Sequence, residues 1–154
     1  MLDYFVQLFR YVAWANRRVI EALRTQPPAQ KEALPLVAHF LAAEHIWLSR
    51  LRGSAATVAV WPQLTLDQCV ALAEENASGY ASFLTALGPA DFTRSVSYRN
   101  TKGIEFQTPV LDILTHAATH GSYHRGQAAK AFGRAGCQAA NTDYITFVRE
   151  ALNS

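Results

Sequence analysis

The sequence predicts an all-α fold: a four-helix bundle with a long connection carrying a short β-hairpin before the fourth helix, plus a short C-terminal helix. Apolar residues recur at three- and four-residue spacing through four long segments. Strict alternation of apolar and polar residues is confined to residues 94–108. The 154 residues, 50% of them hydrophobic, suffice for one domain with its own core, which we expect to span residues 1–154.

The first two helices are defined by helical periodicity and by the residues that end them. Residues 3–25 form the first, with Asp3 as the expected N-cap, and Pro27-Pro28 ends it because proline cannot continue the backbone hydrogen bonds. The second runs from Gln30 to Arg52 before Gly53, although Pro35 leaves open a regular start nearer Leu34. It is apolar almost all round, which is typical of a central helix or a subunit interface.

The third helix and the hairpin follow a loop over residues 53–64. Thr65-Leu66-Asp67-Gln68 fits the capping-box pattern and opens a helix that ends at Gly88-Pro89. In residues 94–108 the apolar side chains alternate with polar ones on either side of Asn100-Thr101-Lys102-Gly103. This arrangement is typical of a β-hairpin.

The fourth helix is predicted to start with Thr108 as N-cap and Pro109 at the first helical position. Glycines 133 and 136 end it, and residues 143–152 form a short closing helix. In a bundle of this kind the second helix can face the fourth across the core. Residues near the middle of both helices can therefore share a site.

Composition excludes several classes of protein. The apolar runs are too short for a membrane helix, and no signal peptide precedes the first helix, so we expect a cytoplasmic protein without a membrane partner. A net charge of +2 without a basic stripe argues against nucleic-acid binding. Cys69 and Cys137 lack the spacing of a disulfide framework or a thiol pair, so we expect two separate thiols.

Histidines at four-residue steps mark the fourth helix: His116, His120 and His124. A four-residue step returns a helical side chain to within about 40° of the same direction and about 6 Å along the axis. Two such imidazoles are close enough to bind one metal ion. His39 on the second helix is the best candidate for a third ligand, whereas His45 points about 120° away from it.

A structural role is the alternative for these histidines, because a single histidine on an apolar face is usually a hydrogen-bonded core residue. Three observations favour metal binding. The stripe is otherwise apolar, so imidazoles buried there without partners would be unfavourable. A further candidate ligand lies on a facing helix, and the stripe carries no acidic partner on its own face.

Several stretches together resemble the DinB-like (damage-inducible) family of helical-bundle metalloproteins. They are Tyr11-Val-Ala-Trp14-Ala-Asn16, His39-Phe-Leu-Ala-Ala-Glu44-His-Ile-Trp47, the Tyr98–Phe106 hairpin, His116-Ala-Ala-Thr-His120-Gly-Ser-Tyr-His124-Arg125-Gly126-Gln127 and Thr142-Asp143-Tyr144-Ile-Thr-Phe147. The resemblance implies a site of His39, His120 and His124 for a divalent ion, zinc or nickel, with His116 as a neighbour. It also implies a homodimer.

The resemblance further implies a metal-dependent thiol S-transferase in detoxification or stress response, acting on a low-molecular-weight thiol and an electrophilic small molecule. Three protein ligands leave a coordination position open, which is the catalytic pattern, whereas structural sites are closed by four. Hydrolysis by metal-activated water is the alternative reaction. A non-catalytic metal-binding stress-response protein is the alternative class, and a fourth ligand from His116 would favour it.

The sequence identifies no catalytic residue. Residues that could act as a general base are Tyr123, Glu44, His116 and Gln127. Arg125 and Asp112 are expected to support the ligands or to lie on the helix surface.

Overall fold

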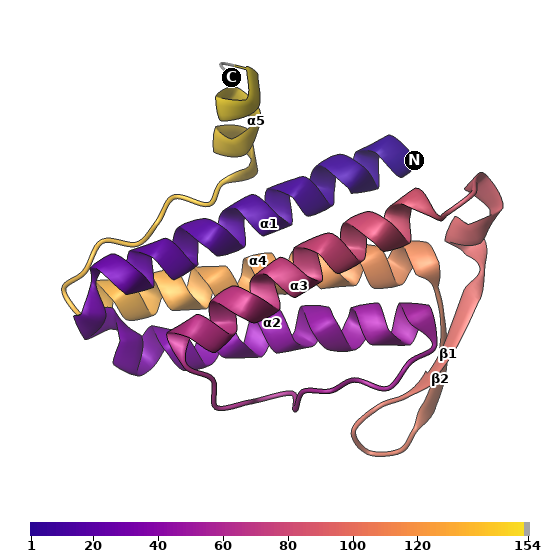
Figure 1. Ribbon diagram of the computed structural model, residues 1–154, viewed down its shortest axis with the longest axis horizontal. Coiled ribbons are helices and arrows are strands. Elements are labelled where there is room, and N and C mark those ends of the chain that lie inside the picture. The colour runs from indigo at the N-terminus through magenta and orange to yellow at the C-terminus, as the bar shows by residue number, and fades with distance from the viewer. Residues whose placement is uncertain (153–154) are drawn as a thin grey trace.

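The computed structural model describes residues 1–152 and confirms the predicted fold (Figure 1). Four long helices form the bundle, a two-stranded antiparallel sheet precedes the fourth, and a short helix projects from the bundle beside the first. The elements are α1 (Leu2–Thr25), α2 (Gln30–Arg52), α3 (Leu66–Thr85), β1 (Ser95–Arg99), β2 (Glu105–Pro109), α4 (Val110–Arg134) and α5 (Tyr144–Leu152).

The predicted start of α1 was wrong, whereas the end of α2 was right. Asp3 lies within the first turn of α1, where its carboxylate complements the helix dipole, and does not cap the helix. A single 3-10 turn, Pro27–Ala29, joins α1 to α2, so α2 is helical from Gln30 and not from Leu34. Gly53 follows α2 with φ 68°, a left-handed conformation that favours glycine.

The predicted capping box of α3 and the predicted hairpin are both present. Thr65 accepts a hydrogen bond from the backbone of Gln68, and the Gln68 side chain accepts one from the backbone of Thr65. In the hairpin Tyr98 pairs with Phe106, and Val96 points into the core.

The start of α4 differs from the prediction by one residue. Pro109 is the residue before the helix, and Thr108 belongs to β2, where it pairs with Val96. The Thr108 hydroxyl hydrogen-bonds to the Tyr98 hydroxyl across the sheet at 3.2 Å and is not used as a cap. Strand pairing therefore replaces the capping interaction that the Thr-Pro pattern favours.

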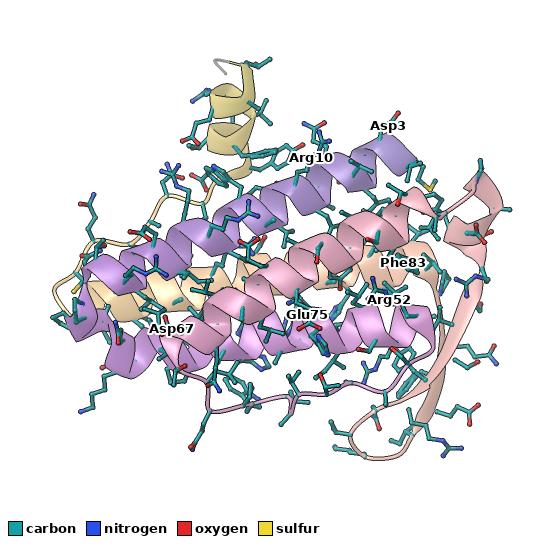
Figure 2. The ribbon with its side chains drawn as sticks, in the orientation of Figure 1. Asp3, Arg10, Arg52, Asp67, Glu75 and Phe83 are labelled. Carbon is teal, nitrogen blue, oxygen red and sulfur yellow. The ribbon has the colours of Figure 1, made fainter. Side chains whose placement is uncertain are left out.

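Packing places α2 along α4 and α1 along α3, with α2 also against α3. The core has two parts, one around Phe9, Tyr80 and Phe92 and the other around Leu23, Phe40 and Phe132. The apolar circumference of α2 is thereby covered within the chain, so α2 is a central helix. Where α2 meets α3, Arg52 donates to the Gly79 carbonyl at 2.8 Å, and Glu75 lies in the same seam (Figure 2).

Cys69 and Cys137 are both free thiols, as expected. Burial raises the pKa of Cys69 to about 11, which keeps this thiol protonated near neutral pH. Within residues 1–152 no helix is long and apolar enough to cross a bilayer.

Candidate metal centre

Three histidines from α2 and α4 meet on one side of the bundle. One ring nitrogen from each of His39, His120 and His124 forms a group whose members all lie within 4.8 Å of one another. The ring centroid of His39 is 4.5 Å from that of His124 and 5.3 Å from that of His120. The four-residue step along α4 and the contact between α2 and α4 thus bring together the three residues that the sequence singled out.

Oxygen acceptors fix the orientation of two of these rings. Nδ1 of His39 lies 2.7 Å from the Val60 carbonyl oxygen, and Nδ1 of His124 lies 2.8 Å from Oε1 of Gln127. Because both oxygens can only accept, each Nδ1 carries the proton. Nε2 of each of these two rings is therefore unprotonated, and on His124 it faces Nε2 of His120. A ring whose other nitrogen donates to an oxygen acceptor is typical of metal-ligating histidines.

The nitrogens on α4 are spaced for a common ion. Nε2 of His124 lies 3.1 Å from Nε2 of His120. Two nitrogens at 2.0–2.1 Å from one tetrahedral ion are separated by about 3.3 Å. The spacing and the donor type therefore fit a divalent ion that prefers imidazole ligands.

Burial also keeps these rings in the form that can bind a metal. It lowers the pKa of His39, and burial together with the nearby His124, His116 and His39 lowers the pKa of His120 to about 4. Both rings are thus neutral near pH 7 in the absence of metal. A neutral imidazole is the ligating form.

The cluster lies beneath the loop that carries Val60 and Trp61. His39 and His124 are buried, while His120 is half-buried. Trp61 stacks on the His39 ring with centroids 3.6 Å apart, and Tyr123 packs edge-on against His124 at 5.1 Å. Trp61 and Tyr123 are 58% and 66% exposed, so two aromatic residues flank the approach from solvent.

His116 lies beside the cluster and outside it. Its ring centroid is 5.3 Å from that of His120 and 4.9 Å from that of Trp47, and its side chain is exposed. The group of nitrogens that could hold an ion does not include it. His116 is therefore a neighbour of the site, as the family resemblance implies.

His45 takes no part in the cluster, in agreement with the helical-wheel count. Its Nε2 lies 3.0 Å from the Thr57 hydroxyl, and its Nδ1 lies 3.7 Å from a carboxylate oxygen of Glu75. The connection over residues 53–64, which runs back along α2, is thereby fastened to the helix (Figure 1). The same connection supplies the Val60 carbonyl and Trp61 to the metal centre.

A second polar cluster lies inside the bundle, and one of its residues, Arg125, directly follows His124 in the sequence. Asn16 of α1 donates from Nδ2 to both carboxylate oxygens of Glu44 at 3.0 Å. Arg125 donates to Oδ1 of Asn16, also at 3.0 Å. All three side chains are 2% exposed, and we call them the buried polar network. Burial raises the pKa of Glu44 to about 7, against the opposing effects of Asn16 and Arg125.

The network extends to α5 and restricts α4. Arg125 also donates to the hydroxyls of Ser122 and Tyr11, and Tyr11 donates to the Thr142 carbonyl before α5. A Cβ on Gly121 would lie 3.0 Å from a nitrogen of Arg125 and 3.2 Å from a carboxylate oxygen of Glu44. Glycine at this position therefore allows the two charged groups to approach the helix.

The remaining candidates divide between the two clusters. Tyr123 and Gln127 contact His124, as candidates near the site should. Glu44 is enclosed in the buried polar network, and Arg125 is buried there too, which excludes the helix surface, one of its two expected positions. Asp112 lies exposed in the first turn of α4.

Sequence reasoning missed the residues that complete the site from the loop. Val60 and Trp61 were part of a segment without periodicity, and a carbonyl oxygen has no sequence signal. Trp61 did have one. A large aromatic residue after Ser54-Ala55-Ala56-Thr57-Val58-Ala59-Val60 is conspicuous, and its presence could have indicated a packing partner.

Comparison with known proteins identifies the family of this chain. The family model described as the DinB family matches residues 1–152. Protein DinB of Bacillus subtilis (strain 168) is 26% identical over a 168-residue alignment that covers 94% of this chain and 93% of the relative. The match includes the helices that carry the three histidines and the loop between them. The chain belongs to the DinB family.

Proposed function

We propose that this chain binds one divalent metal ion through His39, His120 and His124 and uses it to transfer a low-molecular-weight thiol to an electrophilic small molecule. The observation that carries the proposal is the convergence of three ring nitrogens, two of them with their tautomers set by oxygen acceptors. Membership of the DinB family supports it. Zinc and nickel are the ions we expect, because both accept imidazole ligands.

Three neutral ligands suit this chemistry. A divalent ion held by them keeps its full charge and an open position, and there it supplies the Lewis acidity that favours the deprotonated form of a thiol. The oxygens of Val60 and Gln127 hold the rings in place. Trp61 and Tyr123 offer apolar contacts to the electrophile at the exposed side.

Two of the four candidate bases lie where a substrate would meet them. Glu44 is enclosed by Asn16, and Gln127 accepts from His124. His116 and Tyr123 stand beside the cluster with exposed side chains. We propose these two as the residues to examine first for proton transfer.

Metal content by mass spectrometry on tag-free protein tests the site. We expect one divalent ion per chain, and a loss of more than 90% of it in His39→Ala and His120→Ala, since each variant removes one of only three ligands. His116→Ala is the matched control on the same helix and should keep its metal. Loss of the ion in that variant would indicate a fourth ligand and a closed, non-catalytic site.

The reaction is tested with the metal-loaded protein and matched substrates. Low-molecular-weight thiols with a chromogenic aryl halide report thiol transfer, and a nitrophenyl ester without thiol reports hydrolysis. Turnover with the halide, abolished in His120→Ala, supports the transferase. Turnover with the ester alone would identify a hydrolase, and neither activity in a fully loaded protein would favour a metal-binding protein without catalysis.

We also propose a homodimer, as the family resemblance implies. Since α2 is covered within the chain, the interface must come from another face. The projecting helix α5 offers Tyr144, Ile145 and Leu152 as exposed apolar side chains. Light scattering of the full chain and of Ile145→Asp distinguishes a dimer through this face from a monomer.

A further inference from the structure

A cavity lies on the same face of α2 as His39. It has a volume of about 390 Å³, within the usual range for small-molecule sites. It is bounded by the C-terminal end of α2, the following loop and β1, with the lining residues Ile46, Ser49, Arg50, Gly53, Ser54, Ala56, Ser97, Tyr98 and Arg99. Arg50 follows His39 by eleven residues, about three helical turns, and so projects in nearly the same direction.

Arg50 brings one positive charge to this cavity without a carboxylate to offset it. Its guanidinium lies over the rings of Trp47 and Tyr98, 4.3 and 4.5 Å from their centroids. One nitrogen donates to the Arg99 carbonyl at 3.3 Å. Within residues 1–152 no carboxylate lies at ion-pair distance from Arg50, whereas Arg99 pairs with Glu105 at 3.0 Å. The guanidinium is thus held in place by two aromatic rings with most of its donors still available.

Aromatic rings connect this arginine to the metal centre. The ring of Trp47, on which Arg50 lies, is 4.9 Å from the ring of His116. His116 in turn is 5.3 Å from His120. The loop that borders the cavity through Ser54 and its neighbours continues to Trp61 at His39. A series of contacting rings and one loop therefore connect the two sites.

We propose that Arg50 binds a carboxylate of the small-molecule substrate whose other end reaches the histidine cluster. The inference rests on the proposed function and specifies its substrate: a thiol that carries a carboxylate, of the size of a di- or tripeptide. The guanidinium lies near the level of Trp47, and eight residues of helix separate Trp47 from His39. That is on the order of 12 Å, too far for a single cysteine to span.

The chemistry of the cavity favours a carboxylate over a dianionic phosphate. The planar fork of an arginine matches the two oxygens of a carboxylate. One unpaired guanidinium balances one negative charge, because Glu105 already neutralises the second arginine of the cavity. Ser97, also in the lining, has a hydroxyl that can donate to the same group.

Calorimetric titration of the zinc-loaded full chain tests this inference with three probes. Glutathione carries a thiol and two carboxylates, its diethyl ester carries the thiol with both carboxylates masked, and mercaptoethanol carries only the thiol. We expect the wild-type chain to bind glutathione roughly 10-fold more tightly than the diester, the usual size of one charge-assisted contact. Arg50→Gln should reduce that preference to less than twofold.

Two further variants keep the result interpretable. Arg134→Gln removes an arginine paired with Glu32 at the far end of the bundle, and its preference should equal that of the wild type. Arg50→Lys keeps the charge without the fork and should retain part of the preference, which provides a folded variant if Arg50→Gln is unstable. Circular dichroism of each variant reports its folding.

The probes separate failure of this inference from failure of the proposed function. Equal affinity of the wild type for glutathione and its diester overturns the role of Arg50, whatever mercaptoethanol does. An unchanged preference in folded Arg50→Gln overturns it as well. Absence of mercaptoethanol binding, with the carboxylate preference intact, instead contradicts thiol binding at the metal and leaves Arg50 as an anion site.

Discussion

Two polar clusters that both draw on α2 and α4 behave in opposite ways. The buried polar network and the histidine cluster use adjacent residues of α4, Arg125 and His124. In the network Asn16 hydrogen-bonds to both Glu44 and Arg125, so each charged side chain has a polar partner. In the histidine cluster Nδ1 of His39 and Nδ1 of His124 are bound to oxygen acceptors, while one nitrogen from each of the three rings lies within 4.8 Å of the others. Polar side chains that satisfy one another's hydrogen bonds stabilise the fold. Side chains whose acceptor nitrogens converge can instead bind an ion.

The strongest test of this contrast is Arg125→Met. The change leaves Oδ1 of the buried Asn16 without its donor and removes the positive charge beside the buried Glu44, so we expect it to lower the free energy of unfolding by about 3–5 kcal/mol. Urea denaturation measures the loss. Arg134→Met, which breaks an exposed pair, should change stability by less than about 1 kcal/mol. A loss that small for Arg125 as well would contradict the scaffold role.

The next effect is a pH dependence that comes from Glu44 of the network. The folded-state pKa of Glu44 is about 7, above its ordinary value of 4.5, so the folded state binds more protons between these values. Its contribution to stability is full below pH 4.5 and is lost as the pH rises to 7. Glu44→Gln cannot ionise. Its stability relative to the wild type should therefore rise by about 3 kcal/mol between pH 4.5 and 8.

Urea titrations of both proteins across this range measure that difference, in which the other titrating groups cancel. A stability difference that does not change with pH would show that Glu44 titrates normally in the fold. His120→Gln serves as a control from the other cluster. It should leave the Glu44-dependent slope in place, because its ring belongs to the histidine cluster and not to the buried polar network.

An oxygen acceptor of the histidine cluster should affect metal affinity more than stability. Gln127→Leu removes the acceptor that holds Nδ1 of His124, and losses of such outer partners typically weaken metal binding 10- to 100-fold. Competition with a chromogenic zinc chelator measures the affinity. Gln127→Glu restores an acceptor and should recover most of it. Equal affinity in all three proteins would show that the contact does not orient the ligand.

The smallest effects come from two glycines of α4 that differ only in their surroundings. A methyl group on Gly121 meets Arg125 and Glu44, whereas a methyl group on Gly126 meets nothing within 4 Å. Gly126→Ala should stabilise the helix by about 0.5–1 kcal/mol. Gly121→Ala should instead destabilise the protein by about 1 kcal/mol. Thermal unfolding compares the two, and equal shifts in both variants would mean that the network adapts without loss.

The sequence predicted the features that follow from a regular spacing of residues along the chain. The long helices and the hairpin follow from periodicity, and the cluster of His39, His120 and His124 follows from two helical faces that must meet. The start of α4 was wrong because Thr108 satisfies both a cap pattern and a strand pattern, and pairing with Val96 decides between them. The local sequence pattern does not indicate which of these two structures Thr108 adopts.

The network was not predicted because its parts come from three helices. Asn16, Glu44 and Arg125 each look like ordinary surface residues in their own segments, and only the packing of α1, α2 and α4 makes them partners. The Val60 carbonyl is a backbone group in an aperiodic loop. Residues with strong local spacing were predicted, and residues whose partners depend on tertiary contacts were not.

The stack of Trp61 on His39 gives the chain an optical reporter of its own. The indole lies 3.6 Å from the imidazole, close enough for a change in the charge of that ring to alter its emission. Of the other two tryptophans, Trp14 sits against Phe147 of α5, away from the histidines, so Trp14→Phe removes background without touching them. Arrival of a quenching ion such as nickel can then be followed in real time, without a dye, by the fluorescence of the protein itself.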